Sequence, residues 1–214
     1  MKHYSRREAI ITFGIAATSI VAAAAAPAMA AKSTARWWRP TTAMDAMTAI
    51  RTRRSVRSFT NEDVSEEQVR ALLGAAMSAP SAGNEQPWEF VVVRNKATLG
   101  KVGAINRFAQ YAASAPLGVL ACGNLHWERH KGYWIEDVSA ACQNMLLAAH
   151  AIGLGAVWTG IYPQTERVEA FRQLVALPEY VVPMALIVVG HPKATPEPED
   201  RFDAARIHRE RWQG

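Results

Sequence analysis

Apolar residues occur along this chain in two patterns: short uninterrupted runs, and longer segments in which they recur at helical spacing. Uninterrupted runs are typical of strands that are buried on both faces. We expect strands at residues 88–93, 117–122 and 181–190, and a strand followed by a loop at 154–161. Because residues 88–93 are apolar on both faces, we expect this strand to be central in a sheet.

Helical spacing predicts the elements between the strands. The clearest helix start is Ser65, because Gln68 follows at the position where the two residues can cap each other's backbone amides. An earlier short helix reaches Arg51, with Thr41 or Thr42 as its N-terminal cap. Further helices are predicted at residues 96–103, 105–113 and 164–174, and as a polar segment ending at Trp212.

The longest predicted helix covers residues 134–152. Its large apolar residues repeat at helical spacing, and alanines make much of the remaining surface small and apolar. Such a helix must be buried on more than one side, either within one subunit or against a second one. Gly153 suits the left-handed residue that ends a helix. His150 is expected to be a packed, hydrogen-bonded residue of this helix rather than a catalyst.

Residues 1–30 have the features of a signal peptide. Basic residues precede an apolar stretch at 10–26, and Ala28-Met29-Ala30 is a small-x-small cleavage signal. The sequence Ser5-Arg6-Arg7 resembles a twin-arginine export signal, which directs folded proteins across the membrane. We therefore expect a mature chain that begins at Ala31, and its first part, residues 31–43, is expected to be a linker.

This interpretation predicts a periplasmic or otherwise exported protein without stable membrane insertion after cleavage. The alternative is an uncleaved anchor, since the apolar stretch is near the lower limit for spanning a bilayer. If residues 1–30 are not a signal, the protein is expected in the cytoplasm.

Composition limits the remaining classes. Half of the residues are hydrophobic, and roughly 184 residues remain after cleavage, enough for one domain with a substantial core. Removing residues 1–30 lowers the formal charge from +5 to +3, because they carry three basic residues and one acidic residue. This charge is too small to argue for nucleic acid. Cys122 and Cys142 are expected to be buried free thiols, and the scattered histidines lack the spacing of metal ligands.

Positive charge is concentrated at residues 50–59. Arg51, Arg53, Arg54 and Arg57 lie within seven residues, and Ser55 adds a hydroxyl group. A guanidinium group offers a rigid fork of donors that fits two phosphate oxygens. The segment is therefore a candidate anion site, with a solvated basic face or a nucleic-acid patch as the alternatives.

A second motif, Pro80-Ser81-Ala82-Gly83-Asn84-Glu85-Gln86-Pro87-Trp88, follows downstream. In this order the two motifs resemble the nitroreductase family, which combines an Arg-x-Ser-x-basic run with a Pro-Ser-x-x-Asn-x-Gln-Pro-Trp segment. The resemblance extends from Met44 to Trp212. It implies an α+β, nitroreductase-like fold with a central mixed sheet flanked by helices. It also implies an intertwined homodimer and makes residues 44–214 an FMN-binding domain.

The resemblance implies residues that would hold FMN. From one subunit, the phosphate, the ribityl chain and the pyrimidine side would be held by Arg53, Arg54, Ser55 and Arg57, with Arg201 returning to the phosphate. From the other subunit, the flavin would be approached by Pro80, Ser81, Ala82 and Asn84, with Gly83 allowing a tight turn.

The flavin ring would lie against a further set of residues. Asn106 would face the ring, and its other face would be lined by Trp158, Thr159 and Gly160. A backbone N–H near Gly160 or Ile161 would reach N5 of the ring. Glu199 stands where the family often has a second basic residue, which departs from the pattern. Residues 124–133 correspond to a family segment near the substrate pocket, or form an ordinary solvated loop.

The function implied by the resemblance is two-electron transfer from a reduced donor such as NAD(P)H to a nitroaromatic, quinone or similar flat acceptor. No side chain has to act as a nucleophile or as an acid and base, because FMN carries the chemistry. Nicotinamide donors are scarce outside the cytoplasm, and the chain has no glycine-rich dinucleotide fingerprint. The alternative is a flavin-binding redox-partner module without its own NAD(P)H-dependent turnover.

Overall fold

The computed structural model describes residues 44–213. The predicted signal peptide, the linker and the two candidate caps Thr41 and Thr42 lie outside the described residues. In chain order the elements are α1 (Ala46–Thr52), α2 (Glu66–Met77), η1 (Ala82–Asn84), β1 (Trp88–Val93), α3 (Lys96–Ile105), η2 (Arg107–Ser114), β2 (Leu117–Asn124), α4 (Trp134–Ala151), β3 (Gly155–Gly160), α5 (Thr165–Val175), β4 (Val181–Gly190) and η3 (Ala204–Arg206).

The four strands form one sheet in the order β1-β2-β4-β3, and all three strand pairs are antiparallel. A parallel bridge joins Ser55 to Ala156 of β3, so the sheet has one short parallel neighbour. Strand β2 is buried at every position, as its uninterrupted apolar run predicts. These features confirm the predicted α+β fold with helices flanking a sheet.

The predicted central position of β1 is wrong, because β1 lies at an edge of the sheet. Trp88 and Val93 are buried, whereas Val92 is 40% exposed. An apolar run indicates that a strand packs against a core, but it does not indicate whether the strand has one or two neighbouring strands.

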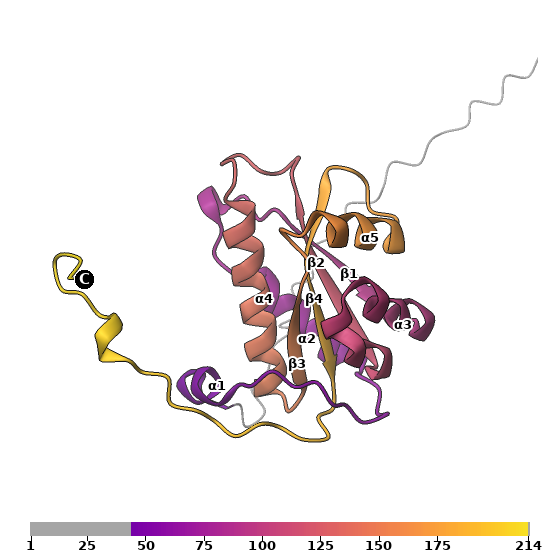
Figure 1. Cartoon of the computed structure of the whole chain (residues 1–214), viewed down its shortest axis with the longest axis horizontal. Coiled ribbons are helices and arrows are strands. Elements are labelled where there is room, and N and C mark those ends of the chain that lie inside the picture. Colours follow the sequence, from indigo (N-terminus) through magenta and orange to yellow (C-terminus); the bar gives the residue numbers. More distant parts are fainter. Residues whose placement is uncertain (1–43, 214) are drawn as a thin grey trace, which may run out of the picture. The chain divides into compact units, whose positions relative to one another are not determined.

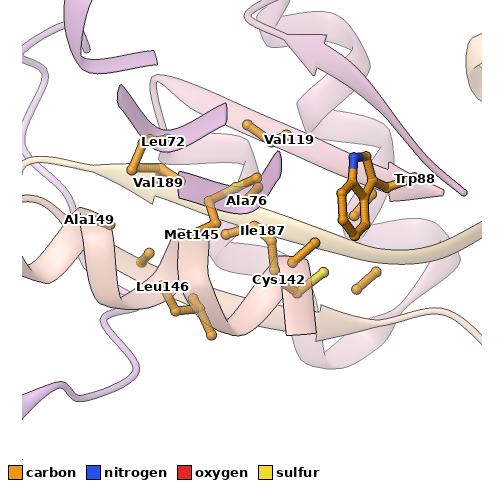
Figure 2. Close-up of a cluster of buried hydrophobic side chains, with 14 of the residues drawn as sticks. Leu72, Ala76, Trp88, Val119, Cys142, Met145, Leu146, Ala149, Ile187 and Val189 are labelled. Atoms are coloured by element: carbon orange, nitrogen blue, oxygen red, sulfur yellow. The ribbon is translucent and has the colours of Figure 1, made fainter. Parts of the chain in front are cut away.

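The sheet lies between two helical layers (Figure 1). Helices α2 and α4 cover one face, where they contribute to a core with Trp88, Val119 and Ile187 (Figure 2). On the opposite face, α3, η2 and α5 form a second core with residues of the same strands. Cys142 lies in the first core and Cys122 in the second, and both are free and buried, as predicted. Burial raises the pKa of each thiol to about 12.

The bounds and the C-terminal end of α4 confirm the sequence prediction. Gly153 follows the helix with φ = +80°, the left-handed conformation that glycine adopts without strain. One side of α4 is buried in the first core. Its other side carries small or apolar residues that are partly exposed, namely Ser139, Ala140, Leu147, Ala148 and Ala151, beside the exposed polar Gln143.

Helix starts depend on short-range hydrogen bonds. The capping box of α2 is confirmed: Gln68 N donates to Ser65 Oγ over 3.2 Å, and Ser65 N donates to Gln68 Oε1 over 2.8 Å. Helix α1 is capped by Asp45, which accepts from Met47 N and Thr48 N. The assignment of this cap to Thr41 or Thr42 was therefore wrong.

The predicted polar helix ending at Trp212 is also wrong. Only the single turn η3 forms in this region, and Phe202 and Trp212 remain about four-fifths exposed. A short helix needs an apolar face packed against other elements, and no such packing stabilises this segment within the described residues. Within residues 44–213, no helix combines the length and hydrophobicity needed to cross a bilayer.

Candidate functional site

The arginine run lies along the open edge of β3. After α1 ends, the chain becomes extended, and Val56 N donates to Ala156 O over 3.0 Å. Gly155 permits this approach, because an added Cβ would lie 2.7 Å from a methyl carbon of Val56. The arginine run is thus attached to the open edge of the sheet at Ser55 and Val56.

A cavity of about 760 Å³ opens between α1 and the C-terminal segment. Its lining includes Arg51, Arg53, Arg54 and Arg201, together with Glu199 and Asp200. Partial burial lowers the pKa of Arg53, and the charges of Arg54 and Arg201 lower it further. Among the described residues, the guanidinium group of Arg53 has no hydrogen-bond or ion-pair partner, whereas its backbone is bonded to Ala49 O and to Arg54 Nη1. A bound anion would relieve this crowding of positive charge.

Arg54 uses its donors on backbone carbonyls. Its Nε donates to Glu197 O over 3.0 Å, and its Nη2 donates to Glu199 O over 3.1 Å. Its Nη1 reaches two carbonyls at the end of α1, those of Arg51 and Arg53. Arg54 therefore attaches the C-terminal segment to α1, a role that the sequence pattern did not indicate.

Arg201 is paired with Glu199, the residue that departs from the family pattern. The Arg201 Nη2 to Glu199 Oε2 distance is 3.1 Å, and both side chains are about two-thirds exposed. Because such an exposed pair is weak, Glu199 reduces the local charge without fixing Arg201.

His150 lies behind Arg53, in a smaller cavity of about 210 Å³ that both Arg53 and Arg54 also line. Its Nε2 is 2.8 Å from Thr52 Oγ1, which confirms the predicted hydrogen-bonded role. Burial lowers the pKa of His150, and Arg53 and Arg54 lower it further. The imidazole therefore stays neutral near pH 7 and adds no cation to the site.

A second group of residues surrounds the same edge of β3. Thr159 is buried, and its Oγ1 is 2.8 Å from the hydroxyl of Tyr111 in η2. The guanidinium carbon of Arg57 is 6.0 Å from the centre of the Tyr111 ring. Two predicted site residues are thus linked through Tyr111, which sequence reasoning missed because a single tyrosine in a short irregular helix carries no spacing signal.

The backbone of β3 distinguishes between the two candidate N–H groups. Ile161 N donates to Met184 O of β4 over 3.2 Å, so it is already used in the sheet. Successive residues of an antiparallel strand point their backbone groups in opposite directions. The N–H of Gly160 therefore points toward the open edge, and the Gly160 carbonyl accepts from Arg167 Nη1 over 3.2 Å.

Two more predicted ring contacts have structural roles in this chain. Asn106 is buried, and its Oδ1 accepts from Phe108 N over 3.1 Å at the start of η2. Trp158 is partly buried and packs against the core formed with α4.

The Pro80–Asn84 motif lies at the opposite end of α4 from the arginines. Ala82 N donates to Asp137 Oδ1 over 2.9 Å, near the start of α4, whereas His150 near its end contacts α1. The thirteen residue steps between Asp137 and His150 correspond to about 20 Å of helix. One chain therefore does not bring the two predicted halves of the site together.

The motif itself is a tight turn, as predicted. Gly83 and Asn84 have φ values of +52° and +55°. Ser81 Oγ accepts from Gln86 N over 3.0 Å, and Asn84 Oδ1 accepts from Gln86 Nε2 over 3.1 Å. Pro80 is exposed on the approach to the turn.

Within residues 44–213, no group of three or more metal-ligating side chains is brought together.

An antiparallel sheet between two helical layers, with an arginine-lined cavity between α1 and the C-terminal segment, defines an α+β domain suited to an anionic ligand. The family described as Nitroreductase matches this chain over residues 50–131 and 128–191. A protein of Methanothermobacter thermautotrophicus, provisionally named NADH dehydrogenase/NAD(P)H nitroreductase, is 45% identical over 169 residues, which cover 79% of this chain and 88% of that protein. The chain belongs to the nitroreductase family.

Solved structures support the same assignment. A provisionally named NADH dehydrogenase/NAD(P)H nitroreductase from Parabacteroides distasonis is similar with a TM-score of 0.75 and 34% identity, over 78% of this chain and 98% of that chain. A provisionally named nitroreductase from Desulfovibrio desulfuricans, solved in complex with FMN, has a TM-score of 0.68 and 34% identity, over 78% of this chain and 97% of that chain.

Proposed function

We propose that this protein uses FMN to transfer two electrons from NAD(P)H to a flat acceptor such as a nitroaromatic compound or a quinone. It is an FMN-dependent oxidoreductase, in keeping with relatives named NAD(P)H nitroreductase and FMN reductase. The observation that carries the proposal is Arg53, a partly buried guanidinium group that lies close to the charges of Arg54 and Arg201.

The residues of the site fit FMN. A phosphate group complements the unpaired guanidinium of Arg53 in a cavity whose wall also holds Arg51 and Arg201. Ser55 follows Arg54 and is bridged to Ala156 of β3, and in this proposal its hydroxyl would donate to the same phosphate. The Gly160 N–H at the open edge provides a donor for the ring. When bound, FMN supplies the redox chemistry by accepting and returning two electrons.

The other residues orient the cofactor. Arg57 would lie near the pyrimidine side, held by the Tyr111 ring and, through it, by Thr159. Arg54 would act indirectly, since it keeps the C-terminal segment against α1 and so completes the wall of the cavity.

We further propose that the active form is a homodimer. The Pro80–Asn84 turn is about 20 Å along α4 from the arginine cavity, too far to complete the same pocket. A second copy would supply this turn across the interface. The partly exposed, small and apolar side of α4 is a surface against which a second copy could pack.

Export through the twin-arginine route remains part of the proposal. It predicts that the protein isolated from cells begins at Ala31 and fractionates with the periplasm. N-terminal sequencing tests the cleavage, which a retained Met1 would overturn. Immunoblotting of periplasmic and cytoplasmic fractions tests the location, which a purely cytoplasmic protein would overturn.

The central experiment measures the cofactor and the donor together. Purified protein should show flavin absorbance and release FMN, identified by mass spectrometry, on denaturation. Reduction of 1,4-benzoquinone and of nitrofurazone is then followed with NADH, NADPH and a quinol as donors. Turnover with a nicotinamide donor supports the proposed function. Bound FMN without turnover from any donor favours the redox-partner module, and a colourless protein that does not bind added FMN rejects both.

A further inference from the structure

Two loops meet at the start of α4 through contacts that the proposed function does not use. We name them the Ser81 loop (residues 80–86) and the His130 loop (residues 124–133). Glu85 Oε2 in the first loop accepts from Arg129 N over 2.7 Å and from His130 N over 3.0 Å in the second. A single carboxylate thus holds two consecutive backbone amides, and charge-assisted bonds of this kind are the strong ones.

Further contacts join the same two loops. Arg129 Nη2 donates to Gly83 O over 2.6 Å. The imidazole of His130 fills the space beside Gly83, where an added Cβ would lie 2.5 Å from Nε2. Gly83 is therefore required for its φ of +52° and also for the close approach of His130.

The junction is electrostatically costly. Glu85 Oε1 and Asp137 Oδ2 are buried, and neither has a hydrogen-bond partner within residues 44–213. Asp137 is almost completely buried, and its Oδ1 anchors the Ser81 loop through Ala82 N. Burying carboxylate oxygens without partners opposes folding. Since the folded protein holds the two loops together despite this unfavourable burial, we infer that the position of the loops is important for function.

The His130 loop carries aromatic surface. Trp127 is 50% exposed and Tyr133 is 55% exposed, one on each side of the residues that Glu85 holds. The beginning of the loop is fixed separately, because His126 stacks on Tyr180 with 3.9 Å between ring centres. Glu85 therefore determines how the Arg129–Tyr133 half of the loop, and its exposed ring, is placed against the Ser81 loop.

We propose that Glu85 is a positioning residue for the electron acceptor. By holding the Arg129–Tyr133 half of the His130 loop on the Ser81 loop, it places the exposed Tyr133 ring where a flat acceptor can stack beside the flavin. The inference rests on the proposed function, because the Ser81 loop is expected to approach the FMN bound by a second copy. Glu85 touches neither cofactor nor substrate in this scheme and acts through the His130 loop.

The test compares E85A with E85Q in the full-length protein. The glutamine carbonyl can still accept both amides, whereas alanine removes the acceptor. In E85A, hydrogen exchange of a peptide covering residues 126–133 should rise about tenfold or more, while β2 is unchanged. The KM for 1,4-benzoquinone should rise by a similar factor, with FMN content and the rate of flavin reduction by the donor preserved. E85Q should restore most of both properties.

Several results would overturn the inference. They are unchanged exchange in E85A, faster exchange with an unaltered acceptor KM, or equal losses in the donor and acceptor half-reactions. If E85A does not fold, R129Q removes the bond to Gly83 O and is tested in the same way. Wild-type FMN content and turnover are measured in parallel, so a failure of the proposed function is seen in wild type, whereas a failure of the positioning role is seen only in the variants.

Discussion

Replacing Arg53 by alanine should weaken FMN binding without destabilising the apoprotein. In the folded chain this guanidinium is partly buried and surrounded by positive charge, so its pKa is lowered. It also lacks a described protein partner. A hydrogen bond to a charged group contributes about 1.5–3 kcal/mol, so losing the contact with phosphate should raise the Kd of FMN by about 10- to 150-fold.

The same environment gives the opposite expectation for stability. Because folding partly buries Arg53 and brings it close to Arg201, removing its charge relieves desolvation and repulsion. The melting temperature of R53A apoprotein should therefore equal or exceed that of wild type. R54A should behave differently, since it loses bonds to the carbonyls of Glu197 and Glu199 and frees the C-terminal segment.

The assay is titration of apoprotein with FMN, followed by quenching of flavin fluorescence. R53K keeps the charge but loses the planar fork, so it should bind with intermediate affinity. R70A is the matched control, because Arg70 is an exposed arginine on α2. A Kd for R53A equal to that of R70A would refute the role assigned to Arg53, as would a large fall in the melting temperature of its apoprotein.

Three further predictions test other parts of the structure. Y111F removes the hydroxyl that contacts Thr159 but keeps the ring beside Arg57, so it should lower the free energy of unfolding by about 1 kcal/mol in denaturant. Y111L also removes the ring beside Arg57, so it should in addition weaken FMN binding. Equal FMN affinity in the two variants would contradict this role of the ring. Because the thiols of Cys122 and Cys142 are buried with pKa values raised to about 12, they should not react with Ellman's reagent at pH 8 until the protein unfolds. Burial raises the pKa of Asp137 from its ordinary 3.8, so the folded protein binds this proton more tightly than the unfolded chain does. The stability gained from this difference is fully present below pH 3.8 and is lost as the pH rises through the pKa of the folded state. D137N should remove this contribution, and identical pH profiles of unfolding free energy for D137N and wild type would exclude it.

Local sequence signals predicted much of the fold. Ser65 and Gln68 cap α2 through contacts between residues close in sequence, and Gly153 ends α4 for a backbone reason that a single residue carries. The position of β1 at the sheet edge could not be predicted in this way. It depends on which strands pair with it, and its own residues do not encode that choice.

The site shows the same division. The charge of the arginine run was readable from sequence, and the motif spacing pointed to the Pro80–Asn84 turn. The separate roles of Arg53 and Arg54 were not readable, because adjacent arginines differ only in what surrounds them after folding. Tyr111 and Asp137 were missed for a related reason, since each acts through one long-range contact that leaves no periodic pattern.

The length of α4 connects these observations. The helix separates the arginine cavity at its C-terminal end from the loops held by Glu85 at its N-terminal end by about 20 Å. In the proposed homodimer, each flavin therefore depends on the cavity of one copy and on the Ser81 loop of the other. A change at Arg53 would affect the site in its own copy, whereas a change at Glu85 would affect the site whose flavin is bound by its neighbour. Cofactor binding and acceptor selection would then be controlled by opposite ends of one helix, and we therefore expect mutations to separate the two functions.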